Sequence, residues 1–275
     1  CIRDSIIVAV CFLSSLIFVQ IMKKVAIFLK VLDVPNDPRK IHKKPMPLLG
    51  GLGIFFAFLL GYMLFAPKNN LMIAVLIGSF LIMLLGLFDD MTKSETPMPN
   101  KYKVLVQLIV AAIVVFYGGL ELTKITLFGM TITFTSIPFL SEFLSILIIV
   151  ATINAINLID GLDGLCAGIS SIYFLTIAII GFILNKFGGL DVILSLIMLG
   201  STLGYLVHNF PPAKIFMGDT GSLFLGFMIS VIALLGYKVT TFTSLVVPIV
   251  VLAIPIFDTL FAILRRLLKL SLIHI

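Results

Sequence analysis

The apolar residues of this chain are gathered in long continuous stretches, separated by short segments rich in Lys, Asp, Asn, Pro and Gly. A hydrocarbon interior has no water to satisfy backbone N–H and C=O groups, so a membrane-spanning chain forms helices or a closed barrel. Barrel strands would show alternating segments of about ten residues, whereas continuous apolar runs of about twenty residues fit helices. The pattern predicts nine spanning helices, at Ser5–Met22, Leu48–Phe65, Leu71–Phe88, Val104–Tyr117, Phe143–Ile156, Leu165–Leu184, Val192–Val207, Leu223–Tyr237 and Thr243–Leu264.

Several of these runs are shorter than the roughly 20 residues that a span requires, so polar residues at their ends are expected to continue the helices. One connection has a different pattern: residues 122–135 alternate Thr and Ile about Phe128–Gly129, which predicts a small β-hairpin. The expected fold class is therefore an all-α polytopic membrane protein of about nine transmembrane helices, with one hairpin at its outer surface.

The composition excludes a soluble globular enzyme. Hydrophobic residues make up 60% of the chain and charged residues only 12%, against about 25% charged in an ordinary globular protein, and the mean hydropathy is +1.23. The net charge of +6 does not indicate nucleic-acid binding, because the 19 Lys and Arg residues form no extended basic face. Cys1, Cys11 and Cys166 lie far apart without metal or disulfide spacing, so they are interpreted as small apolar fillers.

The placement of charge predicts the orientation in the membrane. Fourteen of the 19 Lys and Arg residues fall in the connections on one side and five on the other. Cytoplasmic connections carry the excess of Lys and Arg, so the first side is expected to face the cytoplasm, with the N-terminus outside. Nine of the 13 Asp and Glu residues lie on that same side or at its membrane boundary, which orientation alone does not require. Function is therefore expected at the cytoplasmic face.

Two polar clusters on that face come early in the chain. The loop 33–53 combines Arg39, Lys40 and His42 with glycines and suits phosphates or anionic lipid headgroups, although any positive-inside loop carries such cations. Asp89 and Asp90 end the third predicted span. Adjacent carboxylates at a membrane boundary repel each other, so a metal, proton-transfer or basic partner is expected; the alternative is a solvated helix end.

The third cluster is the segment 154–164. Asn154, Asn157 and Asp160 lie on one face of a helix, and the glycines that follow break the helix so that Asp163 can approach. Oxygen donors without Cys or imidazole suit Mg²⁺ or Mn²⁺. The alternative is that these polar groups only hold helices together.

The fourth cluster, in residues 211–222, precedes the eighth predicted span. Asp219, Thr220 and Ser222, with their glycines, occupy a helix N-terminus, where free N–H groups favour phosphate. Asp, Thr, Ser and Gly are also the ordinary residues of a helix cap and turn, so the motif alone decides nothing.

Together the clusters predict a membrane enzyme that handles phosphates with a divalent cation at the cytoplasmic boundary. A cation-coupled transporter would usually place its polar residues near mid-span in broken helices. A structural or regulatory cation-binding protein would not explain a lysine and glycine loop beside each acidic cluster.

Four segments resemble, in order and spacing, the polyprenyl-phosphate N-acetylhexosamine-1-phosphate transferases: residues 33–53, Asp89–Asp90, residues 154–164 (NAINLIDGLDG) and residues 213–222 (AKIFMGDTGS). The first loop is similar to the branch that starts teichoic-acid and O-antigen type polymers. The phospho-MurNAc-pentapeptide transferases usually have a TPTMGG-like segment where this chain has PMPLLGG.

The resemblance implies transfer of GlcNAc-1-phosphate from UDP-GlcNAc to undecaprenyl phosphate in the bacterial cytoplasmic membrane, with release of UMP. The implied cofactor is Mg²⁺, with Mn²⁺ as an alternative. The same reaction with UDP-GalNAc or UDP-MurNAc-pentapeptide remains open, and so does a homodimer.

The resemblance also implies roles for individual residues. The metal ligands would be Asn157 and Asp219. The catalytic carboxylates would be Asp89 and Asp90, beside the acceptor phosphate, and Asp160 and Asp163, beside the nucleotide. The residues that bind substrate or phosphate would be Lys103, Arg39, Lys40, His42, Asn154, Lys214, Arg265 and Arg266.

Residues 1–269 are expected to form a single transmembrane catalytic domain that is incomplete at both ends, because the chain begins with Cys and does not reach the His-rich loop of the family. Residues 270–275, LSLIHI, are expected to be an artefactual tail, so His274 is not taken for a histidine of that loop.

Overall fold

The computed structural model describes residues 2–35, 44–92, 98–127, 130–134, 136–184 and 188–237. Within these ranges the helices are α1 (Ile2–Phe28), α2 (Gly50–Phe65), α3 (Asn70–Thr92), α4 (Asn100–Ala112), α5 (Leu140–Ile159), α6 (Leu165–Ile183), α7 (Leu190–Asn209) and α8 (Gly218–Tyr237). A π-helical turn, Ile113–Tyr117, prolongs α4. Seven of the described helices are long and apolar enough to cross a membrane, and α2 is a shorter apolar helix. The prediction of an all-α polytopic membrane protein is confirmed.

Eight of the nine predicted spans coincide with these helices, and the ninth, Thr243–Leu264, lies outside the described residues. The polar ends do continue the helices: α3 runs on through Asp89 and Asp90, and α5 through Asn157. The eighth helix starts earlier than predicted, at Gly218. We call the end of the bundle where α3 and α5 finish and α4 and α8 begin the site end.

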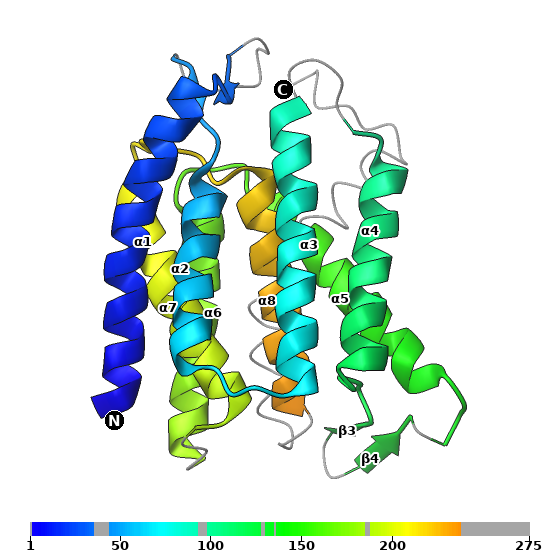
Figure 1. Cartoon of the computed structure of the whole chain (residues 1–275). Coiled ribbons are helices and arrows are strands. Elements are labelled where there is room, and N and C mark those ends of the chain that lie inside the picture. Colours follow the sequence, from blue (N-terminus) through cyan, green and yellow to red (C-terminus); the bar gives the residue numbers. More distant parts are fainter. Residues whose placement is uncertain are drawn as a thin grey trace, which may run out of the picture.

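Two short antiparallel pairs complete the fold. Strands β3 (Lys124–Leu127) and β4 (Met130–Thr133) form the predicted hairpin, at the end of the bundle away from the site end (Figure 1). Strands β1 (Leu32–Asp33) and β2 (Met46–Pro47) were not predicted, because two-residue strands are too short to show an alternating pattern. This second pair brings the two flanks of the basic loop together.

Helix α8 is the centre of the bundle (Figure 1). Its spanning segment is 94% buried, against 28% for α1, and it packs against α2, α3, α5, α6 and α7. Glycines allow the closest approaches: Gly86 of α3 lies against the backbone of Thr220, and Gly226 of α8 against that of Ile153. Small residues let helix backbones approach within a membrane, where dispersion packing drives helix association.

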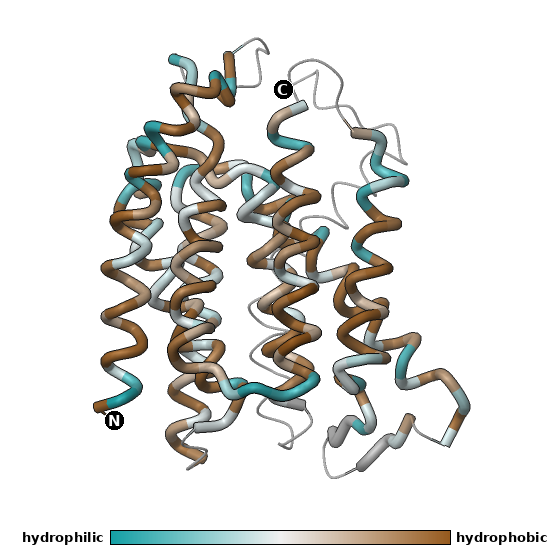
Figure 2. The backbone as a smooth tube through the Cα atoms, in the orientation of Figure 1, coloured by the Kyte–Doolittle hydropathy of each residue, from teal (hydrophilic) through white to brown (hydrophobic). Residues whose placement is uncertain are grey.

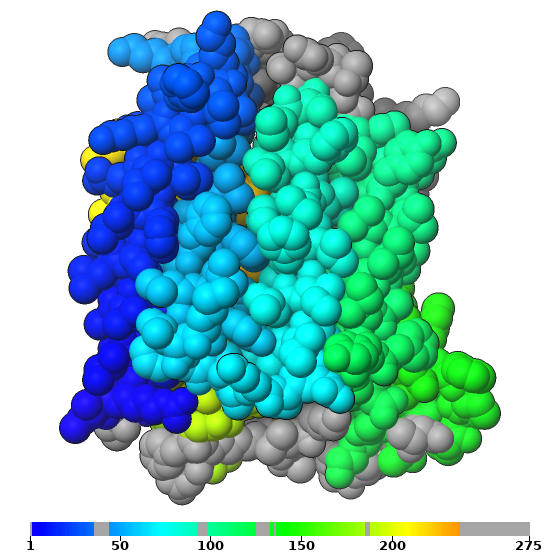
Figure 3. All heavy atoms as spheres, viewed as in Figure 1, coloured from blue at the N-terminus to red at the C-terminus, as the bar shows by residue number. Residues whose placement is uncertain are grey.

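The outer surface is apolar. Helices α1 to α4 lie side by side on one face (Figure 3), and hydrophobic residues dominate the middle of the helices while hydrophilic ones gather towards their ends (Figure 2). Large apolar side chains such as Leu13, Ile17, Phe80 and Leu105 are exposed on these helices. A surface of this kind is suited to hydrocarbon.

Gly86→Ala is expected to lower the thermal unfolding temperature, because a Cβ here would collide with the backbone of Thr220. Overpacking of this kind costs about 1–3 kcal/mol. Unfolding can be followed in detergent, in a Cys1→Ser background, by reaction of the buried Cys11 and Cys166 thiols with a maleimide fluorophore. Gly168→Ala is the matched control, since nothing lies within 4 Å of a Cβ at Gly168. Equal stability of the two variants would contradict the close packing of α3 on α8.

Candidate active site

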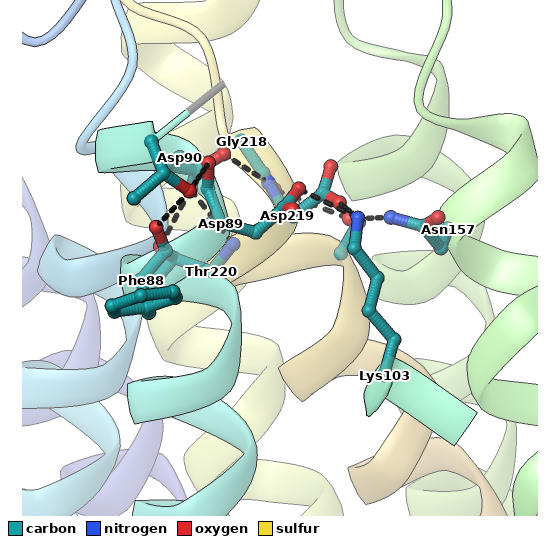
Figure 4. Close-up of polar contacts among 10 residues, drawn as sticks. Phe88, Asp89, Asp90, Lys103, Asn157, Gly218, Asp219 and Thr220 are labelled. Carbon is teal, nitrogen blue, oxygen red and sulfur yellow. Dashed lines mark hydrogen bonds and ion pairs between the residues drawn. The ribbon is translucent and has the colours of Figure 1, made fainter. Parts of the chain in front are cut away.

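A cluster of three carboxylates and one lysine lies at the site end, where α3, α4 and α8 meet (Figure 4). Lys103 of α4 donates from Nζ to Oδ2 of Asp89 at 2.6 Å and to Oδ2 of Asp219 at 3.0 Å. The side chain of Asp89 is 3% exposed and that of Lys103 19% exposed. Burial of charge requires such pairing, so Lys103 holds together two acidic residues that are distant in the sequence.

Asp90 is the cap of α8. Its Oδ1 accepts from the backbone N–H of Asp219 at 2.8 Å, and its Oδ2 accepts from the backbone N–H and the hydroxyl of Thr220, at 2.9 and 2.6 Å. The first N–H groups of a helix have no partner within the helix, and a carboxylate there is favoured by the helix dipole. Gly218, with φ of +71°, sits against this carboxylate where a Cβ would not fit. Asp90 therefore fixes the position of Asp219.

Asp89 is placed differently, although it is the neighbouring residue. Its Oδ2 pairs with Lys103, while its Oδ1 is buried and has no hydrogen-bond partner among the described residues. Buried polar atoms are nearly always paired. Asp89 thus offers an acceptor atom to a ligand, a cation or a proton.

Two amides of α5 pair with side chains of α4 and α8. Asn157 donates from Nδ2 to the hydroxyl of Ser222 on α8 at 2.8 Å. Asn154, one turn earlier, donates from Nδ2 to Oε1 of Gln107 on α4 at 2.6 Å. Three of the four predicted clusters therefore meet at one end of the bundle. Residues Arg39, Lys40 and His42 of the basic loop lie outside the described ranges.

A cavity of about 890 Å³ opens beside the cluster. Ligand sites usually fall between 300 and 1,000 Å³. Its polar lining residues are Asp33, Asn157, Asp160, Asp163, Asn209 and Asp219. Of the four cluster residues, Asp219 lines the cavity, whereas Asp89, Asp90 and Lys103 do not; Asp219 therefore belongs both to the cluster and to the cavity wall.

Hydrogen bonds brace the far wall of the cavity. Oδ2 of Asp163 accepts from the backbone N–H of Ala213 at 2.9 Å. Asn209 accepts from the N–H of Gly164 at 2.9 Å and donates to the carbonyl of Ile215 at 2.9 Å. One carboxylate oxygen of Asp163 is thus engaged in holding the wall. Lys214 follows Ala213 in the chain and is exposed, but it does not line the cavity. Arg265 and Arg266 lie outside the described residues.

Sequence analysis missed Asp33, Gln107 and Asn209. The only signal for Gln107 was its position one helical turn after Lys103, on the same face of α4. Asn209 gave none, since an amide at a helix end is common. Asp33 was counted among the acidic residues of the cytoplasmic side but was not assigned to the site. It lies in strand β1, whose pairing with β2 no sequence pattern predicted, and it lines the cavity.

The donor set suits a hard divalent cation. Asp89, Asp90 and Asp219 against Lys103 leave a formal excess of negative charge, and the available atoms are carboxylate and amide oxygens. Among the described residues no group of three or more His, Cys, Asp or Glu side chains is arranged to hold a metal. Mg²⁺ is commonly bound by one or two carboxylates together with substrate phosphates and water. Asp219 and Asn157 could therefore hold it once a phosphate substrate is bound.

The fold and the site define a polytopic membrane protein that brings acidic, basic and amide side chains together at one end of its bundle. The chain belongs to glycosyl transferase family 4, whose model matches residues 72–237.

Three relatives illustrate the similarity. The chain is 44% identical over 279 residues to the probable undecaprenyl-phosphate N-acetylglucosaminyl 1-phosphate transferase of Bacillus subtilis, covering 98% of this chain and 73% of that protein. It is 33% identical to the decaprenyl-phosphate N-acetylglucosaminephosphotransferase of Mycolicibacterium smegmatis, over 83% of this chain and 62% of the relative. It is 30% identical to the phospho-N-acetylmuramoyl-pentapeptide-transferase of Caldanaerobacter subterraneus, over 82% and 72% respectively.

Proposed function

We propose that the protein transfers GlcNAc-1-phosphate from UDP-GlcNAc to undecaprenyl phosphate, giving undecaprenyl-diphosphate-GlcNAc and UMP, and so starts a cell-envelope polysaccharide. The observation that carries this proposal is the 44% identity, over nearly the whole chain, with the Bacillus subtilis relative and the activity in its name. The adjacency of the two sites supports it: Asp219 lines the cavity while Lys103 and Asp89 beside it do not, and such a transfer needs a place for a nucleotide next to a place for a lipid phosphate.

In the proposed reaction a phosphate oxygen of the acceptor attacks the β-phosphorus of UDP-GlcNAc, and the bond between that phosphorus and the UMP oxygen breaks. Asp160 and Asp163 line the cavity that takes the nucleotide. Lys103 offsets phosphate charge, and Asp89 receives the acceptor proton through its unpartnered oxygen. Mg²⁺ held by Asp219 and Asn157 would supply further charge compensation to the diphosphate. These roles describe direct attack; in an aspartyl-phosphate route a carboxylate would attack the β-phosphorus first, and the acceptor would then displace it.

Asp90 has a different role in this proposal from the one that the family resemblance implied. Both of its oxygens are engaged at the start of α8. We therefore assign it to positioning Asp219, and leave Asp89 as the carboxylate that faces the acceptor.

The site end is proposed to face the cytoplasm, where UDP-sugars are made. The excess of Lys and Arg in the connections on that side supports this orientation. It places the N-terminus of α1 outside the cell.

The test is an exchange assay on membranes that carry the full-length gene product, with radiolabelled UDP-GlcNAc, undecaprenyl phosphate and Mg²⁺. Label is expected in the lipid fraction, and chelation of the metal is expected to remove it. Label from UDP-MurNAc-pentapeptide instead would keep the reaction and change the donor, an outcome to which the Caldanaerobacter relative gives some weight; UDP-GalNAc is tested in the same way. No lipid product from any donor would overturn the proposal in favour of a transporter.

A further inference from the structure

Two residues that do not line the cavity, Asp89 and Gln107, each have a side-chain polar atom without a partner in the described part of the chain. Nε2 of Gln107 is buried without a hydrogen-bond partner among the described residues, and so is Oδ1 of Asp89. The two side chains are 1% and 2% exposed. One is a donor and the other an acceptor. Both residues adjoin Lys103, since Asp89 contacts it and Gln107 lies one helical turn further along α4. An orphaned donor and an orphaned acceptor on either side of one lysine indicate a ligand that binds both kinds of group.

The orientation of the Gln107 amide follows from its neighbours. Nδ2 of Asn154 lies 2.8 Å from the carbonyl of Val150, one helical turn earlier in α5. A carbonyl only accepts, so this atom of Asn154 must be the nitrogen. The same nitrogen lies 2.6 Å from the Gln107 side chain, which must therefore present its oxygen. The NH₂ group of Gln107 is left pointing elsewhere, as a free donor.

The position of Gln107 places it beside Lys103. The two residues are four apart in α4 and share a face of that helix. Lys103 already contacts Asp89 and Asp219. Gln107 lies one turn further from the site end, deeper in the bundle, and neither it nor Lys103 lines the cavity.

We propose that Gln107 is a further binding residue for the acceptor phosphate, to which its Nε2 donates a hydrogen bond. This inference rests on the proposed function. A phosphate monoester offers oxygens that accept from Lys103 and from Gln107, and when protonated a hydroxyl that donates to Oδ1 of Asp89. A phosphate bound there satisfies both orphaned atoms, and its lipid chain is already at membrane depth.

Gln107→Glu is the decisive variant. The carboxylate keeps an oxygen for Asn154 but replaces the donor by an acceptor, which disfavours a phosphate. We expect the KM for undecaprenyl phosphate to rise at least about tenfold, equivalent to about 1.4 kcal/mol, with the KM for UDP-GlcNAc within about twofold of wild type. Gln107→Leu, which removes both groups, should show the same selective rise.

A binding measurement separates this role from turnover. Undecaprenyl phosphate should raise the thermal unfolding temperature of the wild type in detergent and raise that of Gln107→Glu much less, while undecaprenol, which lacks the phosphate, should raise neither. Equal stabilisation by undecaprenol would mean that the lipid chain and not the phosphate is bound, and would overturn the assignment of Gln107 to the phosphate.

Ser195→Ala is the matched control. Ser195 is also fully buried with an unpartnered oxygen, but it lies in α7 away from the site. Its variant should keep both KM values. A defect in Gln107→Leu without one in Gln107→Glu would reduce Gln107 to a support for Asn154 and overturn the inference. Absence of transfer by the wild type would refute the proposed function instead. The stabilisation measurement does not depend on transfer, so it tests the role of Gln107 separately.

Discussion

Asp219→Asn is expected to reduce transfer at least about 10³-fold while leaving the helical fold intact. Asp219 is the carboxylate that lies between the cavity and Lys103, which it contacts at 3.0 Å. Losing its charge weakens a metal ligand and part of the lysine pairing, and metal charge compensation is worth several kcal/mol in such reactions. The cap of α8 survives, because Asp219 contributes to it through its backbone N–H. The measurement is the rate of lipid labelling over a range of Mg²⁺ concentrations.

Asp191→Asn is the control for this substitution. Asp191 is likewise an aspartate in the first turn of a helix, α7, and is 7% exposed, but it lies at the opposite end of the bundle. It should retain activity. Asn157→Ala is expected to lose Mg²⁺-dependent turnover as Asp219→Asn does, because both residues are assigned to the metal. Wild-type rates in either variant would remove that assignment.

The helices could be predicted because hydrocarbon leaves a chain few choices. A run of apolar residues near twenty must become a helix in a membrane, and the eight helices described follow those runs. The ends of the helices were harder to predict than their apolar cores. Polar residues such as Asp90 and Asp219 continue or begin a helix only when another element pairs with them. Strands β1 and β2 depend on a contact across a loop, which no local pattern reveals.

The candidate site could be predicted as a set of segments but not as an arrangement. Polar residues at a membrane boundary need partners, which is why Asp89 and Asp90 were expected beside a metal or a basic group. The roles of Lys103, Asn157 and Asp219 came from the family resemblance. The different roles of Asp89 and Asp90 could not be predicted from the sequence. Neighbouring residues on a helix point about 100° apart, so Asp89 and Asp90 meet different helices, and only the positions of α4 and α8 decide which carboxylate is engaged.

Asp89→Asn is expected to lower the transfer rate about 10²- to 10⁴-fold, the range for loss of a positioned proton acceptor, without lowering thermal stability. The side chain keeps its size, and Lys103 keeps its contact with Asp219. The loss should fall on acceptor use more than on UDP-GlcNAc binding, because Asp89 does not line the cavity. Steady-state kinetics with each substrate varied in turn measure the difference. An equal loss of UDP-GlcNAc affinity would contradict the acceptor role.

Asp90→Asn is the comparison for Asp89→Asn, because it changes the neighbouring carboxylate in the same way. The three hydrogen bonds that Asp90 accepts all come from the first turn of α8, and hydrogen bonds to charged groups contribute about 1.5–3 kcal/mol each. An amide has one oxygen for these donors and turns its NH₂ group towards the others, so this variant should unfold at a lower temperature by the maleimide assay and lose activity with its fold. Asp89→Asn would then lose turnover but keep its stability, whereas Asp90→Asn would lose both. If both variants kept their stability and lost only turnover, Asp90 would belong to the chemistry rather than to the cap of α8.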